Sequence, residues 1–335
     1  MKINLANNIN NFNKITPKTT SPVTFLGLNK TTSEVQNKAN FNFIKKMSCT
    51  LEAKRIQKKS DKNIKLSQEL LKRAQGIKKN AKIALIEAKA IQKQAQRIKK
   101  FGLSALMEQS EIKDGKAFVY VGNPKDKKRD LFIFDARNRE LISFSKNVEI
   151  DGESFSADKH YSFNNGKLDT YDEYFLKIEG EDSLLEKSLD RYIFQEDELC
   201  EYSSLREAWQ GIRLKMDEVF AFKDDKVHYY CNQLTYDYEE GLDYSKAQID
   251  FGENEEMAEY IEGELQDAFG EKTYKRYFKY QNNALKSVSI YPIQTKQDGF
   301  VSDRVFSCVE GKIKYCAFDQ KENGLNVTYS TKMEI

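Results

Sequence analysis

Residues 161–171 read Tyr-Ser-Phe-Asn-Asn-Gly-Lys-Leu-Asp-Thr-Tyr, and this stretch contains the pattern that decides the fold. Aromatic residues occupy its first and third positions, a spacing typical of a half-buried strand. Asn165-Gly166 in the middle is the dipeptide most typical of a two-residue hairpin turn. Leu168 and the closing Tyr171 then supply apolar side chains for a returning strand. The stretch therefore predicts a β-hairpin.

The same unit recurs seven times in the C-terminal two thirds of the chain. Each copy has two apolar residues separated by one position, both aromatic in five of the seven copies, then a polar turn, an aliphatic residue and, three positions later, another apolar residue. The second aromatic position, which is a cysteine in the last copy, falls at residues 134, 163, 194, 222, 251, 280 and 308, in steps of 28 to 31. Glycines at 152, 180, 211, 241, 270, 299 and 324 keep a similar period and indicate the loops between copies. This period of about 29 residues predicts seven hairpins, with about 14 strands, in an antiparallel meander.

The octapeptide Tyr161–Leu168 resembles the hairpins of bacterial repeat proteins of the MORN-variant, antitoxin-type class, and YD-repeat proteins look similar. The resemblance covers residues 130–320 and implies a meander of β-hairpins. The copies depart from the pattern of those classes, because the period here is longer and most copies lack Asn-Gly. Repeat scaffolds serve many functions, so the resemblance implies an architecture without implying an activity.

The net charge of +2 conceals a division of the chain into oppositely charged parts. Residues 1–108 contain 23 Lys and Arg against 6 Asp and Glu, a net charge of +17, and the remainder contains 31 against 46, a net charge of −15. Such a change predicts a domain boundary near residue 109. We expect an α+β protein with a disordered Asn/Thr/Ser-rich tail over residues 1–43, a basic amphipathic helical region over 44–108 and an acidic hairpin repeat domain over 111–330.

The basic region has the composition and periodicity of a long helix. It lacks proline, and its dominant residues are mostly good helix formers, which predicts one long helix or a helical hairpin, with Gly76 and the nearby Asn80 as the expected break or bend. A heptad pattern places large residues such as Ile56 on one line and small ones such as Ala74 on another. This narrow stripe allows close approach of another surface. We expect it to pack along the sheet, or to self-associate with a second copy through residues 50–105 as a coiled coil.

Lysine and arginine residues flank the stripe and are candidates for binding a polyanion, either nucleic acid or an anionic membrane surface. The alternatives are a solvated helix face and an intramolecular contact with the acidic half. Aromatic residues are absent from this region before Phe101, which weakens the case for base stacking and for membrane anchoring. The candidates are Lys58, Lys59, Lys62, Lys65, Lys72, Arg73, Lys78, Lys79, Lys82, Lys89, Lys93, Arg97, Lys99 and Lys100.

Signals of catalysis are absent from the sequence. No nucleophile elbow, phosphate-binding loop or zinc-protease motif occurs, and the five cysteines lack metal-ligand spacing. We therefore expect a protein that is not an enzyme and that has no catalytic residues, cofactor or metal. The sequence contains no run of 18 apolar residues, so no transmembrane segment is expected, and it shows no apolar signal sequence. A cytoplasmic location is the default expectation, with export by a route without a cleaved signal as the alternative.

These observations favour a non-catalytic interaction or scaffold protein. It would bind a protein partner through the β-repeat surface, with the basic helix as an anchor or oligomerisation element. An exported bacterial effector or surface protein is the alternative. A polyanion binder acting through the basic helix is a weaker one.

Overall fold

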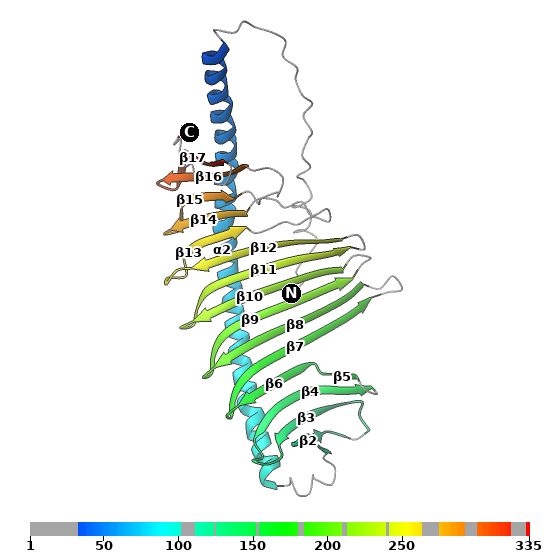
Figure 1. Ribbon diagram of the computed structural model, residues 1–335. Helices are drawn as coiled ribbons and strands as arrows, with labels where there is room; N and C mark the ends of the chain where they lie inside the picture. Colours follow the sequence, from blue (N-terminus) through cyan, green and yellow to red (C-terminus); the bar gives the residue numbers. More distant parts are fainter. Residues whose placement is uncertain are drawn as a thin grey trace. The chain divides into compact units, whose positions relative to one another are not determined.

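The computed structural model describes residues 33–101, 111–123, 125–151, 154–179, 184–209, 213–238, 241–262, 275–291, 300–322 and 333–335. It consists of the helix α2 (Ser33–Phe101) followed by one antiparallel sheet of 18 strands (Figure 1). The expected α+β class, with a long helix before an antiparallel meander, is confirmed. The strands are β1 (Glu111–Lys113), β2 (Lys116–Val121), β3 (Lys128–Asp135), β4 (Leu141–Asp151), β5 (Ser154–Ser156), β6 (Lys159–Asn164), β7 (Lys167–Glu179), β8 (Leu184–Gln195), β9 (Glu198–Trp209), β10 (Arg213–Lys223), β11 (Lys226–Tyr238), β12 (Gly241–Phe251), β13 (Met257–Glu262), β14 (Lys275–Gln281), β15 (Ala284–Tyr291), β16 (Phe300–Val309), β17 (Lys312–Glu322) and β18 (Met333–Glu334).

The sheet follows the order of the chain, because each strand pairs with the next one, except that β5 and β6 both pair with β4. The seven repeat copies are β3 with β4, β6 with β7, and then the consecutive pairs from β8 to β17. The expectation of about 14 strands was too low for the whole sheet. β1 and β2 form an additional hairpin before the first copy, and β5 and β18 are further short strands.

The hairpin turns have the backbone conformation that their sequences favour. At Asn165-Gly166 both φ angles are positive, at 50° and 72°, as a type I′ turn requires. The right-handed twist of this turn matches the twist of the two strands that it joins. The same pair of positive φ angles occurs at Asp114-Gly115, Glu196-Asp197, Asp224-Asp225, Asn282-Asn283 and Glu310-Gly311. Of the glycines expected in the loops between copies, only Gly241 lies within the described residues, at the start of β12.

A β-bulge in every copy keeps the apolar residues on one face. Tyr161 lies opposite Tyr171 and Phe163 lies opposite Leu168, although two positions separate the first-strand residues and three separate those on the second strand. The extra residue is taken up by a register shift directly before the second aromatic position, and this shift occurs in all seven copies. Without it the alternation of a strand would place one of the two residues on the wrong face.

The apolar face of the sheet carries a row of aromatic rings from Phe132 to Tyr230, after which Ile249 interrupts the row. Tyr171 lies with its ring centre 4.8 Å from that of Tyr161 and 5.3 Å from that of Tyr192 in the next copy, and Tyr192 lies 4.9 Å from Tyr202. These distances are typical of favourable ring pairs. Each copy therefore stabilises its neighbours through cross-strand contacts, as in other repeat proteins.

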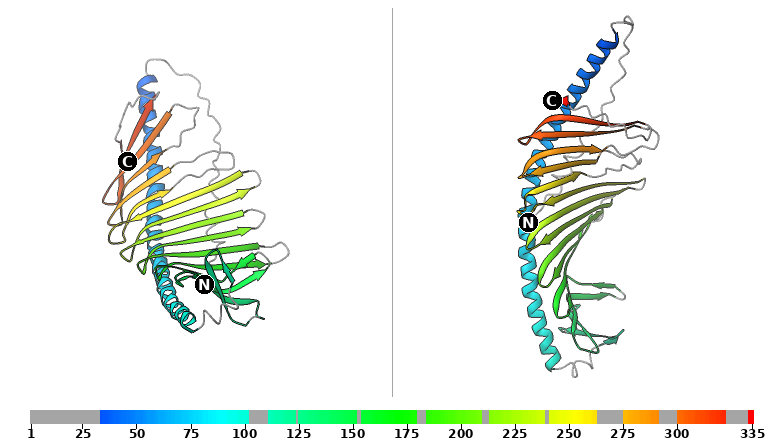
Figure 2. Two further views of the ribbon diagram at one scale, coloured as in Figure 1. Left: turned by 60° about the horizontal axis from the view of Figure 1, so that its bottom comes forward. Right: turned by 60° about the vertical axis from the view of Figure 1, so that its left-hand side comes forward.

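The chain divides into two compact units, Met1–Ser48 and Cys49–Ile335. In the second unit, α2 lies on one face of the sheet and crosses the strands near their hairpin turns (Figures 1 and 2). The expectation that the stripe packs on the sheet is confirmed. The alternative expectation was that the stripe joins two copies of the chain through residues 50–105. In the structure the chain's own sheet covers the stripe. The buried stripe consists of Cys49, Ala53, Ile56, Ser60, Asn63, Ser67, Leu70, Ala74, Ile77, Ala81, Ala84, Ala88, Ile91 and Ala95.

The helix differs from expectation at its start and at Gly76. It begins at Ser33, so the expected disordered tail of residues 1–43 was wrong for residues 33–43, and residues 1–32 lie outside the described part. Neither glycine nor proline occurs from Ser33 to Gln75, so nothing in that stretch interrupts a helix. α2 continues through Gly76 and Asn80, which excludes the expected break and the helical hairpin. Residues 102–108 of the expected helical region also lie outside the described residues.

One heptad of the helix spans one hairpin of the sheet. Gln92 donates to the carbonyl of Gly166 at 2.6 Å, and Gln57 donates to that of Gly311 at 3.0 Å, so the helix runs opposite to the order of the copies. Lys78 donates to the carbonyl of Asp225, midway, at 2.6 Å. Seven helical residues rise about 10.5 Å, and two strands are about 9.6 Å wide, so the two repeats stay in step.

Candidate functional site: the two faces of the helix

The flank of the helix that faces the sheet carries a row of charges complementary to those of the strands. Four charged residues on one helical line, at spacings of 7 or 14 positions, meet partners on the strands, and acidic helix residues meet basic strand residues and the reverse. The pairs are Glu52 with Arg304, Lys59 with Glu262 at 2.9 Å, Arg73 with Glu218 at 2.5 Å, and Glu87 with Lys159 at 3.2 Å. A helix shifted by one heptad would keep its apolar stripe but bring Lys59 opposite Arg304. The charges therefore specify which heptad faces which hairpin.

Arg73 and Glu218 form the most buried of these pairs. The guanidinium donates to both carboxylate oxygens, at 2.7 and 2.5 Å, and Tyr230 donates its hydroxyl to the same carboxylate at 2.9 Å. The side chain of Glu218 is only 3% exposed, whereas that of Arg73 is 49% exposed. Arg73 also lies over the ring of Phe220. Because a buried carboxylate needs its partners, this pair attaches the middle of the helix firmly to the fourth copy.

Glu87 makes the corresponding contact with the second copy. Its carboxylate accepts hydrogen bonds from the hydroxyl of Tyr161 and from Lys159. Burial opposes its ionisation, but these two hydrogen bonds outweigh that effect and hold the pKa of Glu87 below its ordinary value. Burial and the bond to Glu87 raise the pKa of Tyr161.

A buried polar pair marks one further position on the interface. Asn63 occupies the large-residue line of the stripe and is 2% exposed. Its amide donates to the hydroxyl of Tyr280 at 3.3 Å, and Tyr280 is the only tyrosine at the second aromatic position of any copy. A polar residue in the helix therefore meets the one polar residue in that row, which is a common way of fixing the alignment of packed elements.

The fourteen candidate polyanion-binding residues separate into two groups. Lys59, Arg73 and Lys78 contact the sheet, so for them the intramolecular alternative is correct. The other eleven are exposed, and Lys54 and Arg55, which the sequence analysis did not include, are exposed as well. Their positions in the heptad, away from the buried stripe, could have identified them. The exposed candidates are Lys58, Lys62, Lys65, Lys72, Lys79, Lys82, Lys89, Lys93, Arg97, Lys99 and Lys100.

A single line of lysines runs along the outer face, opposite the buried stripe. We call Lys58, Lys65, Lys72, Lys79 and Lys93 the lysine row; they recur every seven residues except at Ile86, which occupies the missing place. The row spans about 52 Å with a spacing of about 10.5 Å. Asp61 and Glu69 are the only acidic residues on the exposed face of the helix between Lys54 and Lys100. The outer face is therefore strongly and almost uniformly positive.

The other face of the sheet contains a polar row whose residue types invite comparison with a catalytic triad. Ser145 Oγ lies 2.8 Å from Nδ1 of His160, and Asp172 pairs across the strands with His160. Ser145 is 1% exposed, and Arg191 donates to both oxygens of Asp172 at 2.8 and 2.9 Å. A triad needs an accessible serine on the other ring nitrogen and a carboxylate directed at Nδ1. This arrangement differs from that of a triad, and the four side chains link β4, β6, β7 and β8.

A scan against protein-family models finds no match for this chain, and a search of curated proteins finds none either. The resemblance to MORN-variant hairpins therefore stays a prediction. Among the residues that the structure describes, no group of three or more His, Cys, Asp and Glu side chains is arranged to hold a metal ion. No helix in the described part is long and apolar enough to cross a membrane.

Proposed function

We propose that this protein is a non-catalytic binding protein that presents a basic helix to a polyanionic partner. One observation carries the proposal: Lys58, Lys65, Lys72, Lys79 and Lys93, the lysine row, are all exposed and lie on the side of the helix opposite the buried stripe. If the charge of the helix served only to attach it to the acidic sheet, the cations would concentrate on the sheet-facing flanks. They lie instead opposite the stripe.

The sheet supports this role by holding the helix in place. Isolated helices are marginally stable and bend, and a row of like charges destabilises them further. Here the aromatic row, the ion pairs and the turn contacts hold the helix from Cys49 onward along the strands. The lysine row is thus presented in a fixed geometry. The hypothesis that the strands themselves bind a protein partner, and the hypothesis of export, stay predictions.

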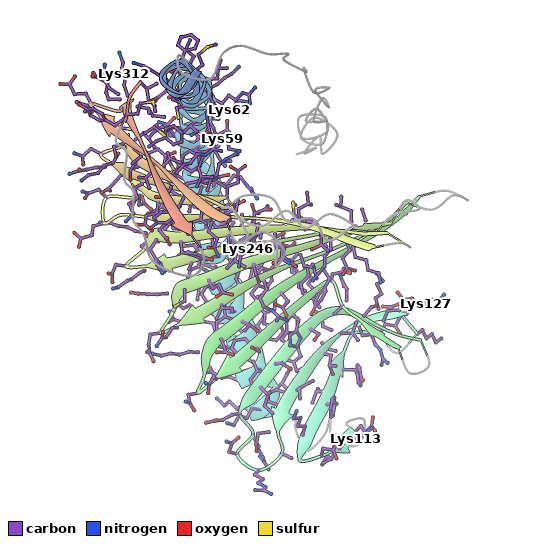
Figure 3. All side chains as sticks on the ribbon, turned by 45° about the horizontal axis from the view of Figure 1, so that its top comes forward. Lys59, Lys62, Lys113, Lys127, Lys246 and Lys312 are labelled. Carbon is purple, nitrogen blue, oxygen red and sulfur yellow. The ribbon has the colours of Figure 1, made fainter. Side chains whose placement is uncertain are left out.

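Retention of the full chain on immobilised heparin, with elution by salt, tests the proposal. The lysine-row variant has Lys58, Lys65, Lys72, Lys79 and Lys93 replaced by Gln. The matched control has the same charge change on the sheet, at Lys113, Lys125, Lys127, Lys187 and Lys246, of which Lys113, Lys127 and Lys246 are labelled in Figure 3. We expect the lysine-row variant to elute at much lower salt than the wild-type protein and the control to elute close to it. Equal elution of the two variants would contradict the proposal.

A further inference from the structure

The length and surroundings of the lysine row indicate what kind of polyanion it fits. Its charges extend along about 52 Å of helix, and an extended anionic surface can contact many members of such a row. A nucleic-acid duplex turns once in about 34 Å, so its phosphates approach such a row only where a strand crosses it. Single-stranded nucleic acid is bound largely by base stacking, and no aromatic residue lies between Lys46 and Lys100. The extent of the row and the lack of aromatic residues therefore favour a membrane surface.

The outer face also carries apolar side chains at one place in the row. Ile83 and Ile86 are 46% and 69% exposed, one turn apart, and Lys79, Lys82 and Lys89 surround them. The apolar side chains of these isoleucines make no favourable contact with the phosphate backbone of a nucleic acid. Among lipid headgroups, however, they can reach the boundary of the acyl chains while the lysines remain at the phosphates.

The buried stripe limits how the helix can meet a membrane. An interfacial amphipathic helix ordinarily buries its apolar face in the bilayer. In this protein the apolar face is covered by the sheet, through residues such as Leu70 and Ala74, which are 2% and 1% exposed. Contact must therefore be shallow and mostly electrostatic, with the helix between the sheet and the bilayer.

We infer that the lysine row, together with Ile83 and Ile86, is a docking surface for the anionic leaflet of a lipid bilayer. This inference rests on the proposed function and names its partner class. Each lysine close to an anionic leaflet strengthens membrane binding severalfold. The attraction declines within a Debye length, which is about 10 Å at 0.1 M salt. Binding should accordingly be reversible and sensitive to ionic strength.

Co-sedimentation of the full chain with lipid vesicles tests the inference. The vesicles are phosphatidylcholine with or without phosphatidylglycerol, and duplex DNA is the competing ligand. We expect binding to the phosphatidylglycerol vesicles only. The lysine-row variant should lose more than about a hundredfold in partition coefficient, whereas the sheet control should stay close to the wild-type protein. Circular dichroism and thermal unfolding confirm that each variant is folded.

A second variant, Ile83→Ser with Ile86→Ser, separates the membrane from other polyanions. It should weaken vesicle binding about fivefold to tenfold, because apolar contact is lost, and leave heparin elution unchanged. Heparin binding without vesicle binding, or tighter binding to DNA than to vesicles, would overturn the membrane inference and leave the proposed function standing. Absence of binding to all three ligands would overturn both.

Discussion

Two glycines in this protein have opposite roles, and the difference lies in their backbone conformation. A Cβ atom added at Gly76 or at Gly166 would meet nothing within 4 Å. Gly76 lies inside α2 on the exposed face, whereas Gly166 has a φ of +72° in the hairpin turn of the second copy. Both sites therefore have room for a side chain, and they differ only in the backbone conformation that a substituted residue would have to adopt.

We expect Gly76→Ala to stabilise the protein by about 0.5–1 kcal/mol, because alanine loses less backbone entropy on entering a helix. The matched variant Gly166→Ala should destabilise it by about 1–2 kcal/mol, because alanine is strained at positive φ. Chemical denaturation of the two variants measures both effects. A destabilised Gly76→Ala variant would indicate that the helix needs flexibility at that point.

The buried tyrosines give the protein a predictable response to alkaline pH. Burial raises the pKa of Tyr192 to about 12, and the pKa values of Tyr161, Tyr171, Tyr202 and Tyr230 are raised as well. In the unfolded chain a tyrosine loses its proton near pH 10. Between these values the folded state holds more protons than the unfolded state, so stability falls as pH rises.

We expect the contribution of these tyrosines to the free energy of unfolding to be constant below about pH 10. Above that pH the free energy of unfolding should decline steeply. Tyrosinate absorbance and loss of sheet circular dichroism should appear together, because the hydroxyls ionise when the sheet opens. Tyr192→Phe should make the decline shallower by about one proton. Tyrosinate formation in a sheet that remains folded would show that the hydroxyls are accessible to water.

At the scale of the element, the helix and the sheet are joined by polar contacts at defined places as well as by the apolar stripe. Arg73 and Glu218 provide the clearest test, because the carboxylate is buried and also accepts a hydrogen bond from Tyr230, while Arg73 lies over the ring of Phe220. Arg73→Gln leaves that carboxylate without its charged partner. We expect a loss of about 2–3 kcal/mol, below the range for fully buried pairs because Arg73 is half exposed.

A double-mutant cycle with Glu218→Gln measures the pair itself. The double variant should be more stable than the sum of the two single effects indicates, with a coupling of at least about 1 kcal/mol. Lys79→Gln, a charge change on the outer face of the same helix, is the control and should stay within about 0.5 kcal/mol of the wild-type protein. Additive effects in the cycle would show that the ion pair does not attach the helix.

The hairpins could be predicted from the sequence because the information for each lies within a few residues. The alternation at Tyr161 and Phe163 and the turn at Asn165-Gly166 are local signals. The bulge was also encoded, in the spacing of three between Leu168 and Tyr171 against two on the first strand, but was not inferred. The hairpin β1–β2 was also not predicted, although Asp114-Gly115 is a dipeptide typical of a hairpin turn.

The candidate site could be predicted only in part, because the heptad pattern does not say which hairpin each heptad faces. The stripe predicted a buried side and an exposed side for the helix. It could not identify Lys59, Arg73 and Lys78 as the cations that contact the sheet, since their partners are separated by 145 to 203 residues. That separation also hid the alternation of charge along the interface.

At the scale of the whole molecule, the equal lengths of a heptad and a hairpin make the two repeats interdependent. Deleting residues 212–240 removes the fourth hairpin and moves the later copies one heptad along the helix. Arg304 would then lie opposite Lys59 in place of Glu52. Deleting residues 74–80 as well removes the heptad that contacts the fourth hairpin and restores the alignment of all remaining pairs.

We therefore expect the double deletion to be more stable than the hairpin deletion alone, although it lacks more of the protein. Each copy contacts mainly its neighbours, so loss of one hairpin with its heptad should shorten the protein without disrupting the rest. Denaturation of the three deletion variants and the wild-type protein measures this. A double deletion less stable than either single one would contradict the correspondence of heptads and hairpins.

The opposite direction of helix and copies also determines the order in which the protein can assemble during synthesis. The helix leaves the ribosome before any strand. The hairpin made soon after it docks near Gln92, whereas the last docks at Gln57, 254 residues away from its turn glycine. Each new hairpin thus finds a finished edge strand on one side and an empty stretch of helix beneath it. Growth proceeds back toward the first helical residues to be made, and the most recently translated strands cover the oldest part of the stripe.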